Sequence, residues 1–140
     1  MNVEGFSFDP PPGFRTEEMT LGMRMGPPGN RVSPSLIVQS KQAREGATLE
    51  ALAAETLVEL VQTVPNMKSP SKTEFTFADG GTGVVLAYNF TAKTGDLRQY
   101  FVLRLHQGKL CSITLTIPAS ALNEGNAKTF MDAIASVKPA

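Results

Sequence analysis

The sequence predicts an α+β fold in which two helices pack on an antiparallel sheet. Most of the chain alternates between apolar and polar residues with a period of two, which is typical of strands with one buried face. Residues 48–64 and 127–137 instead repeat apolar residues at intervals of three and four, which is typical of helices. A length of 140 residues suits one domain that covers residues 1–140 and buries enough surface for a stable core.

Charge and composition exclude several classes of protein. Lys plus Arg and Asp plus Glu both number 13, so the formal net charge is zero, which argues against binding nucleic acid by bulk electrostatics. No stretch approaches the roughly 18 apolar residues that a membrane-spanning helix needs. The first residues lack the basic and apolar regions of a signal peptide. We therefore expect a cytoplasmic protein with no nucleic acid partner and no stable membrane insertion.

Short strands separated by turns rich in Pro and Gly are predicted for the N-terminal third. Residues 6–8 alternate and are followed by the turn sequence DPPPG, which predicts a first strand. Residues 19–25 are predicted to form one strand, and residues 35–39 another. The apolar positions of the strand over 19–25 are Met19, Leu21, Met23 and Met25. Methionine is common both at adaptable binding surfaces and at core edges, so this stripe has two interpretations.

Residues 48–64 predict the central helix, with Thr48 as its N-cap and Pro65 as its stop signal. The apolar residues cover roughly 200° of its circumference, whereas an ordinary surface helix needs only about 100°. Either the domain itself buries this wide arc on two sides, or the helix presents apolar surface to a partner.

A four-strand antiparallel meander is predicted after a polar connection at residues 66–72. Its strands alternate around residues 75–78, 84–90, 97–106 and 111–117, with short turns between them. The closing helix over residues 127–137 has two candidate N-caps, Asn123 and Asn126.

Residue types that carry chemistry are sparse. His106 is the one imidazole, and it is on the polar face at the end of its predicted strand. No nucleophile and base can be arranged around it from the sequence. Cys111, the one thiol, is on the inward parity and is predicted to be a small buried side chain. The glycine-rich sequence DGGTG at residues 79–83 lacks a P-loop lysine and indicates a hairpin turn. We therefore expect no catalytic residue, no metal site and no cofactor.

Gln99 is out of place in its predicted strand. It is on the same face of the strand as the apolar residues Leu97 and Phe101. An amide on a buried face needs hydrogen-bond partners. The partner is either a local turn or the backbone of a bound apolar segment, where few other polar groups are available.

Several segments together carry a family resemblance. They are the Pro/Gly turn after the first strand, the sequence SLIV at residues 35–38, the helix that ends at Val64, the sequence GDLRQYF at residues 95–101, and SITLT at residues 112–116 before a proline and the closing helix. These segments resemble the PsbP/DcrB-like fold, and within it the chain is most similar to the Eag chaperones of type VI secretion effectors.

That resemblance implies a small cytoplasmic homodimer that shields apolar helices near the N-terminus of a secreted effector before export. It also implies a hydrophobic groove lined by Leu21, Met23, Ile37, Thr56, Leu60, Val64 and Gln99. An exposed apolar surface of this kind marks a binding site or an aggregation hazard. The alternative is a non-catalytic protein-binding module on the same fold, such as an extrinsic or regulatory subunit, and nothing in the sequence favours an enzyme.

Overall fold

The structure is a computed structural model. It describes residues 2–3, 5–19, 22–26, 35–93, 95–121 and 124–140. Its strands are β1 (Asn2–Val3), β2 (Phe6–Ser7), β3 (Arg15–Met19), β4 (Gly22–Gly26), β5 (Ser35–Gln42), β6 (Lys68–Thr76), β7 (Thr82–Ala92), β8 (Gly95–His106), β9 (Lys109–Pro118) and β10 (Lys138–Pro139). Its helices are α1 (Leu49–Thr63), the 3-10 helix η1 (Ala119–Ala121) and α2 (Glu124–Ala135). The predicted α+β class is confirmed.

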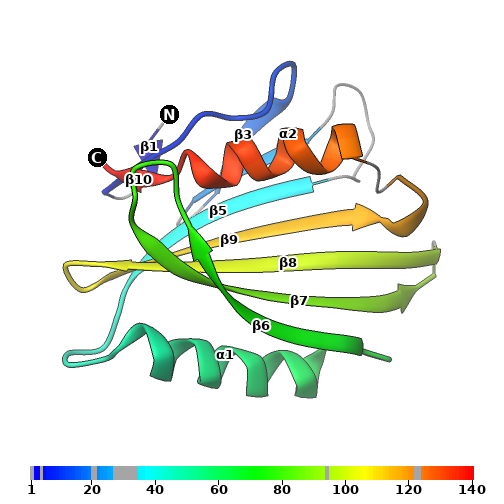
Figure 1. The fold of residues 1–140 in the computed structure, drawn as a ribbon, viewed down its shortest axis with the longest axis horizontal. Coiled ribbons are helices and arrows are strands. Elements are labelled where there is room, and N and C mark those ends of the chain that lie inside the picture. The colour runs from blue at the N-terminus through cyan, green and yellow to red at the C-terminus, as the bar shows by residue number, and fades with distance from the viewer. Residues whose placement is uncertain (1, 4, 20–21, 27–34, 94, 122–123) are drawn as a thin grey trace.

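One large antiparallel sheet dominates the described part of the chain. Its strand order is β3-β4-β5-β9-β8-β7-β6, and every neighbouring pair is antiparallel. Strands β6 to β9 follow one another as the predicted meander, and β5 adds to the β9 edge (Figure 1). The long strands β7, β8 and β9 therefore have a neighbouring strand on each side, and their alternate residues can be buried on both faces of the sheet.

Two separate hydrophobic clusters show that the sheet has a helix on each face. In one cluster Ile113 and Ile117 of β9 pack with Ile134 of α2. In the other, Leu110 of β9 packs with Leu52 of α1. Because neighbouring residues of a strand point to opposite faces, we call these the α2 face and the α1 face. Figure 1 shows the two helices on opposite sides of the strands.

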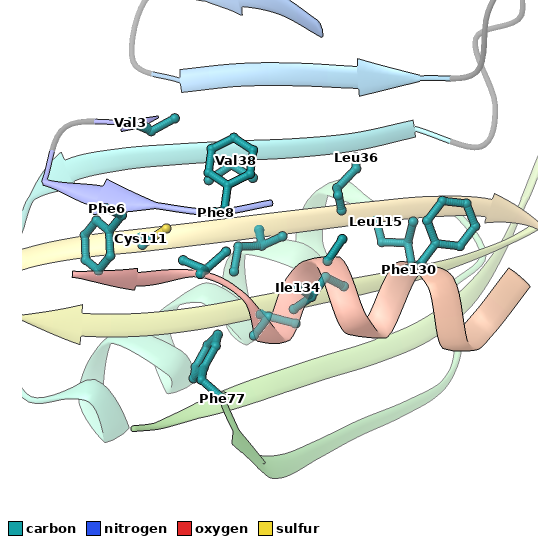
Figure 2. Packing of buried hydrophobic residues seen from close by; sticks show 14 of the residues in the cluster. Val3, Phe6, Phe8, Leu36, Val38, Phe77, Cys111, Leu115, Phe130 and Ile134 are labelled. Carbon is teal, nitrogen blue, oxygen red and sulfur yellow. The ribbon is translucent and has the colours of Figure 1, made fainter. Parts of the chain in front are cut away.

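The α2 face is the larger core. Figure 2 shows Phe130 and Ile134 of α2 directed toward Leu36, Val38 and Leu115 on the strands beneath. Side chains from the start of the chain complete the cluster, and they are Val3, Phe6 and Phe8. The first residues of the chain are thus structural parts of the main core.

A small second sheet joins the two ends of the described chain. Strand β2 pairs with both β1 and β10, so that Ser7 lies opposite Lys138. The main-chain N–H of Ala140 also donates to the carbonyl of Gly5 at 2.8 Å. Figure 1 accordingly shows both ends side by side. The predicted first strand is confirmed at Phe6–Ser7, in this small sheet.

The prediction of one strand over residues 19–25 is wrong. Strand β3 ends at Met19 and β4 begins at Gly22, and these two residues are partners in an antiparallel pair. In such a ladder directly paired residues share a face. The positions of Met19 and Gly22 are therefore on one face of the sheet, and the position of Met23 is on the other. Period-two alternation cannot distinguish a straight strand from a hairpin with a two-residue connection, and the turn reverses the parity.

The predicted connection at residues 66–72 is also wrong in part, because β6 begins at Lys68. The strand contains a register irregularity between Lys68 and Ser71, and Ser69 has a φ of 52°. Strand β6 is an edge of the sheet and nearly all its residues are exposed. An edge strand protected by lysines, a proline and a bulge has the composition of a loop, which explains the error.

The helix limits follow their local signals closely in α1. The Thr48 hydroxyl accepts from the N–H of Ala51 at 3.2 Å, and the helix ends at Thr63, two residues before Pro65. In α2 the predicted start is too late, because the helix begins at Glu124 and Asn126 lies inside it. The other candidate cap, Asn123, lies outside the described residues. Neither described α-helix combines the length and the apolar character that a membrane crossing requires.

Candidate functional site

The α1 face is only partly covered by its helix. Helix α1 packs on β7 and β8, and the sheet continues beyond it to β9 and β5. The register aligns Ile37 of β5, Thr114 of β9 and Phe101 of β8 in one row across this part of the face. All three side chains are half-buried, so the row forms an accessible, mainly apolar surface beside α1.

A cleft of about 270 Å³ lies between α1 and this part of the sheet. Its lining residues are Gln39, Ser40, Lys41, Thr56, Glu59, Leu60, Thr63, Phe101, Leu103, Leu110 and Ser112. Apolar side chains alternate there with hydroxyl, amide and charged groups. A cavity of this size accepts a few side chains and not a whole helix.

Four of the predicted groove residues fall on or beside this surface. Thr56 and Leu60 line the cleft from α1. Ile37 and Gln99 belong to successive rows on the same face of the sheet, as their pairing partners Thr114 and Thr116 show. Val64 caps the C-terminus of α1 and is half-buried, and its N–H donates to the carbonyl of Leu60 at 2.8 Å.

The assignment of Met23 to the same groove surface is wrong. Met23 is paired with Val38, whose side chain lies in the α2 core, whereas Ile37 is paired with Arg24. Met23 and Ile37 therefore hold register positions on opposite faces of the sheet. The cause is the pairing register between β4 and β5, which alternation within one strand does not reveal. Leu21 lies outside the described residues.

Gln99 has partners that neither sequence interpretation named. Its Oε1 accepts a hydrogen bond from the hydroxyl of Tyr88 on β7, and its Nε2 donates to Oγ1 of Thr116 on β9 at 2.7 Å. The three residues are register partners across adjacent strands. Burial raises the pKa of Tyr88 to about 12, so its hydroxyl keeps its proton at neutral pH. We call Tyr88, Gln99 and Thr116 the polar row.

The wide apolar arc of α1 is divided between two environments. Leu52 and Ala53 are buried against the sheet, and Leu57 and Leu60 pack at the edge of the same cluster. On the outer side Val58 remains 59% exposed, and Val61 remains 56% exposed. Part of the arc thus serves the core, and part is presented to solvent.

The sequence reasoning missed an ion pair on the α2 face, which joins a buried arginine to a partly exposed aspartate. Arg104 is 6% exposed, and its guanidinium donates to both carboxylate oxygens of Asp79, at 2.9 and 2.7 Å. It also donates to the carbonyl of Val137 at 2.8 Å and lies over the ring of Phe77. The hydrogen bond from Arg104 lowers the pKa of Asp79 to about 2. The signal available in the sequence was that Arg104 is on the same face of its strand as Val102, which is buried.

Cys111 is fully buried, as predicted, and burial raises the pKa of its thiol to about 12. A thiol with such a pKa is not a nucleophile at neutral pH. His106 is half-buried, with its ring edge-on to Phe6 at 6.5 Å between centroids. Within the described ranges no three His, Cys, Asp or Glu side chains are grouped so that they could hold a metal ion.

No family model and no curated protein matches the sequence. Solved structures do match in fold. CyanoP, the PsbP of Synechocystis sp. PCC 6803, is 14% identical with a TM-score of 0.70, over 97% of this chain and 87% of CyanoP. This chain has a PsbP-like fold.

Two further structures share the PsbP-like fold. A protein of unknown function from Pseudomonas aeruginosa, described as a candidate regulator, is 16% identical with a TM-score of 0.60, over 94% of this chain and 82% of that one. A Bacteroides thetaiotaomicron protein is 13% identical with a TM-score of 0.68, and this chain covers only 45% of it. Identities this low establish the fold alone, because one fold supports many functions.

Proposed function

We propose that this protein is a cytoplasmic, non-catalytic chaperone of the Eag type, which shields apolar helices of a type VI secretion effector on its α1 face. The observation that carries the proposal is the uncovered part of that face. There Ile37, Phe101 and Leu60 form a half-buried apolar surface next to a cleft. The likeness of residues 95–101 and 112–116 to that family supports the same reading.

The proposed mechanism is burial of the client's apolar face. An apolar helix in water exposes surface that favours aggregation, and covering it gains about 25 cal/mol for each Å² removed from water. Thr56 and Thr63 of α1 are small enough for a second helix to approach α1 closely. In this proposal the protein acts as a homodimer, so that two α1 faces cover one or two client helices.

The test is a charge placed in the groove, compared with the same charge outside it. The client is first captured with the tagged protein from its own cells, and its N-terminal apolar segment is then produced as a purified fragment. We expect Ile37→Glu to weaken binding of that fragment at least ten-fold, because the new carboxylate would be buried against hydrocarbon. Val58→Glu is the matched control, since Val58 is 59% exposed on the outer side of α1.

Both variants must show the unfolding midpoint and circular dichroism of a folded protein before binding is compared. Equal affinity of Ile37→Glu and the wild-type protein for the fragment would overturn the groove assignment.

A second candidate function is a module that binds a folded protein surface. The exposure of Val58 and Val61 on the outer side of α1 favours it. The same pair of variants separates the two proposals. Loss of binding by Val58→Glu, with Ile37→Glu unaffected, would assign the partner surface to the outer side of α1.

A further inference from the structure

The polar row is a directed chain of hydrogen bonds. Tyr88 donates to Gln99, and Gln99 donates to Thr116. Each donor in this chain lies on the strand next to its acceptor, from β7 through β8 to β9. The chain begins at a side chain with no exposed surface, Tyr88, and ends at a half-buried one, Thr116.

The hydroxyl of Thr116 is the open end of this chain. Its oxygen accepts from Gln99, so its own proton remains available for donation. Among the residues that the structure describes, none accepts a hydrogen bond from this hydroxyl. Hydrogen bonds in series polarise one another, so the donors behind Thr116 strengthen it as a donor.

Thr116 also lies where a client helix would pass. It is one same-face step along β9 from Thr114, which belongs to the row of Ile37 and Phe101. A step of two residues along a strand is about 6.6 Å. A helix that covers Ile37 and Phe101 therefore covers Thr116 as well.

We propose that Thr116 is a specificity-determining donor, which selects apolar helices that carry one hydrogen-bond acceptor, such as a serine, within the apolar stretch. The inference rests on the proposed function of the α1 face. A purely hydrocarbon helix would bury the Thr116 hydroxyl without an acceptor, and an unpaired buried donor costs free energy. A helix that places a hydrogen-bond acceptor next to Thr116 pairs with this hydroxyl and avoids that cost. Gln99 and Tyr88 are positioning residues, because they orient and polarise the Thr116 hydroxyl.

The test uses two synthetic probe helices and needs no identified client. Both are Leu/Ala peptides of about 20 residues with terminal lysines, and they differ only at the central position, which is Ser or Ala. Dissociation constants are measured by fluorescence anisotropy. We expect the wild-type protein to bind the Ser peptide about five-fold more tightly than the Ala peptide, the usual value of one satisfied hydrogen bond.

Variants then identify the donor. Thr116→Val keeps the shape of the side chain without the hydroxyl, and it should bind both peptides equally. Thr116→Ser should retain the preference. Gln99→Met, which removes the amide, should reduce the preference without removing it. Thr73→Val is the control, because Thr73 is exposed on the edge strand β6 and should leave the preference unchanged.

Each contrary result has a distinct meaning. Equal binding of both peptides by the wild-type protein would overturn the inference and leave the chaperone proposal standing. A preference that survives in Thr116→Val would overturn the assignment of the donor to Thr116. Binding of neither peptide would contradict the proposed function and the inference with it.

Discussion

The two faces of the same strands are built differently. On the α2 face five aliphatic side chains of β5 and β9 are no more than 1% exposed, and they are Leu36, Val38, Ile113, Leu115 and Ile117. On the α1 face the residues that alternate with these five are half-buried, and they are Ser35, Ile37, Gln39, Ser112, Thr114 and Thr116. One face is therefore a closed aliphatic core, and the other combines hydroxyls with scattered apolar groups. A single sheet can thus stabilise the fold with one set of residues and leave the next set partly accessible.

The most direct test of this difference between the two faces is to truncate two adjacent side chains of β9. Ile113→Ala should lower the free energy of unfolding by about 3 kcal/mol, because it opens a cavity in the closed core. Thr114→Ala, one residue along, should lower it by less than about 1 kcal/mol, since a half-buried side chain leaves no cavity. Urea unfolding of the two variants measures both values. Equal losses would show that the two faces do not differ as the burial indicates.

The second prediction concerns the ion pair that helps to close the α2 face. Asp79→Asn should lower the free energy of unfolding at pH 7 by about 2 kcal/mol, because it leaves the charge of Arg104 without its partner. Denaturation of Asp79→Asn and of the wild-type protein across pH measures the difference.

The sign of the pH dependence follows from the depressed pKa of Asp79. In the folded protein this pKa is about 2, against an ordinary value of 3.8. The unfolded chain takes up the proton more readily. The contribution of the ion pair to the free energy of unfolding is therefore complete above about pH 4 and is lost as the pH falls toward 2. The two proteins should therefore converge in stability at the acid end of the range. A constant difference down to pH 2 would contradict the assignment.

The smallest expected effect is on the α1 side. Thr48→Ala removes the N-cap of α1 and should cost about 1 kcal/mol. Thr48→Asp restores an acceptor for the same N–H and should recover most of that loss. Thermal unfolding of the two variants measures the change. Because α1 forms one wall of the cleft, an equal loss in both variants would indicate that the cap does not support this wall.

Local signals explain what could be predicted from the sequence. The alternation of β7, β8 and β9 and the cap of α1 depend on residues close together in the chain, and both predictions are confirmed. In the candidate site, Thr56 and Leu60 line the cleft, and their role as groove residues, which the family resemblance implied, stays a prediction.

Features that depend on distant residues were not predictable. The face on which Met23 lies depends on the pairing of β4 with β5, which alternation does not reveal, and the edge strand β6 has the composition of a loop. The partner of Arg104 lies 25 residues away in sequence. The partners of Gln99 come from two other strands, so only the register could show that its amide is already bonded on both sides.

The small sheet that joins β2 to β10 has a consequence for engineering. Because residues 6–7 pair with residues 138–139, a short flexible linker can join the two ends of this chain without disturbing the core. A circularly permuted protein could then begin in the exposed segment around Gly46, which precedes α1 and has open space around its Cα. In such a protein α1 would lead the polypeptide and β5 would end it. The two walls of the cleft, which are adjacent in the natural sequence, would then be the first and last elements made.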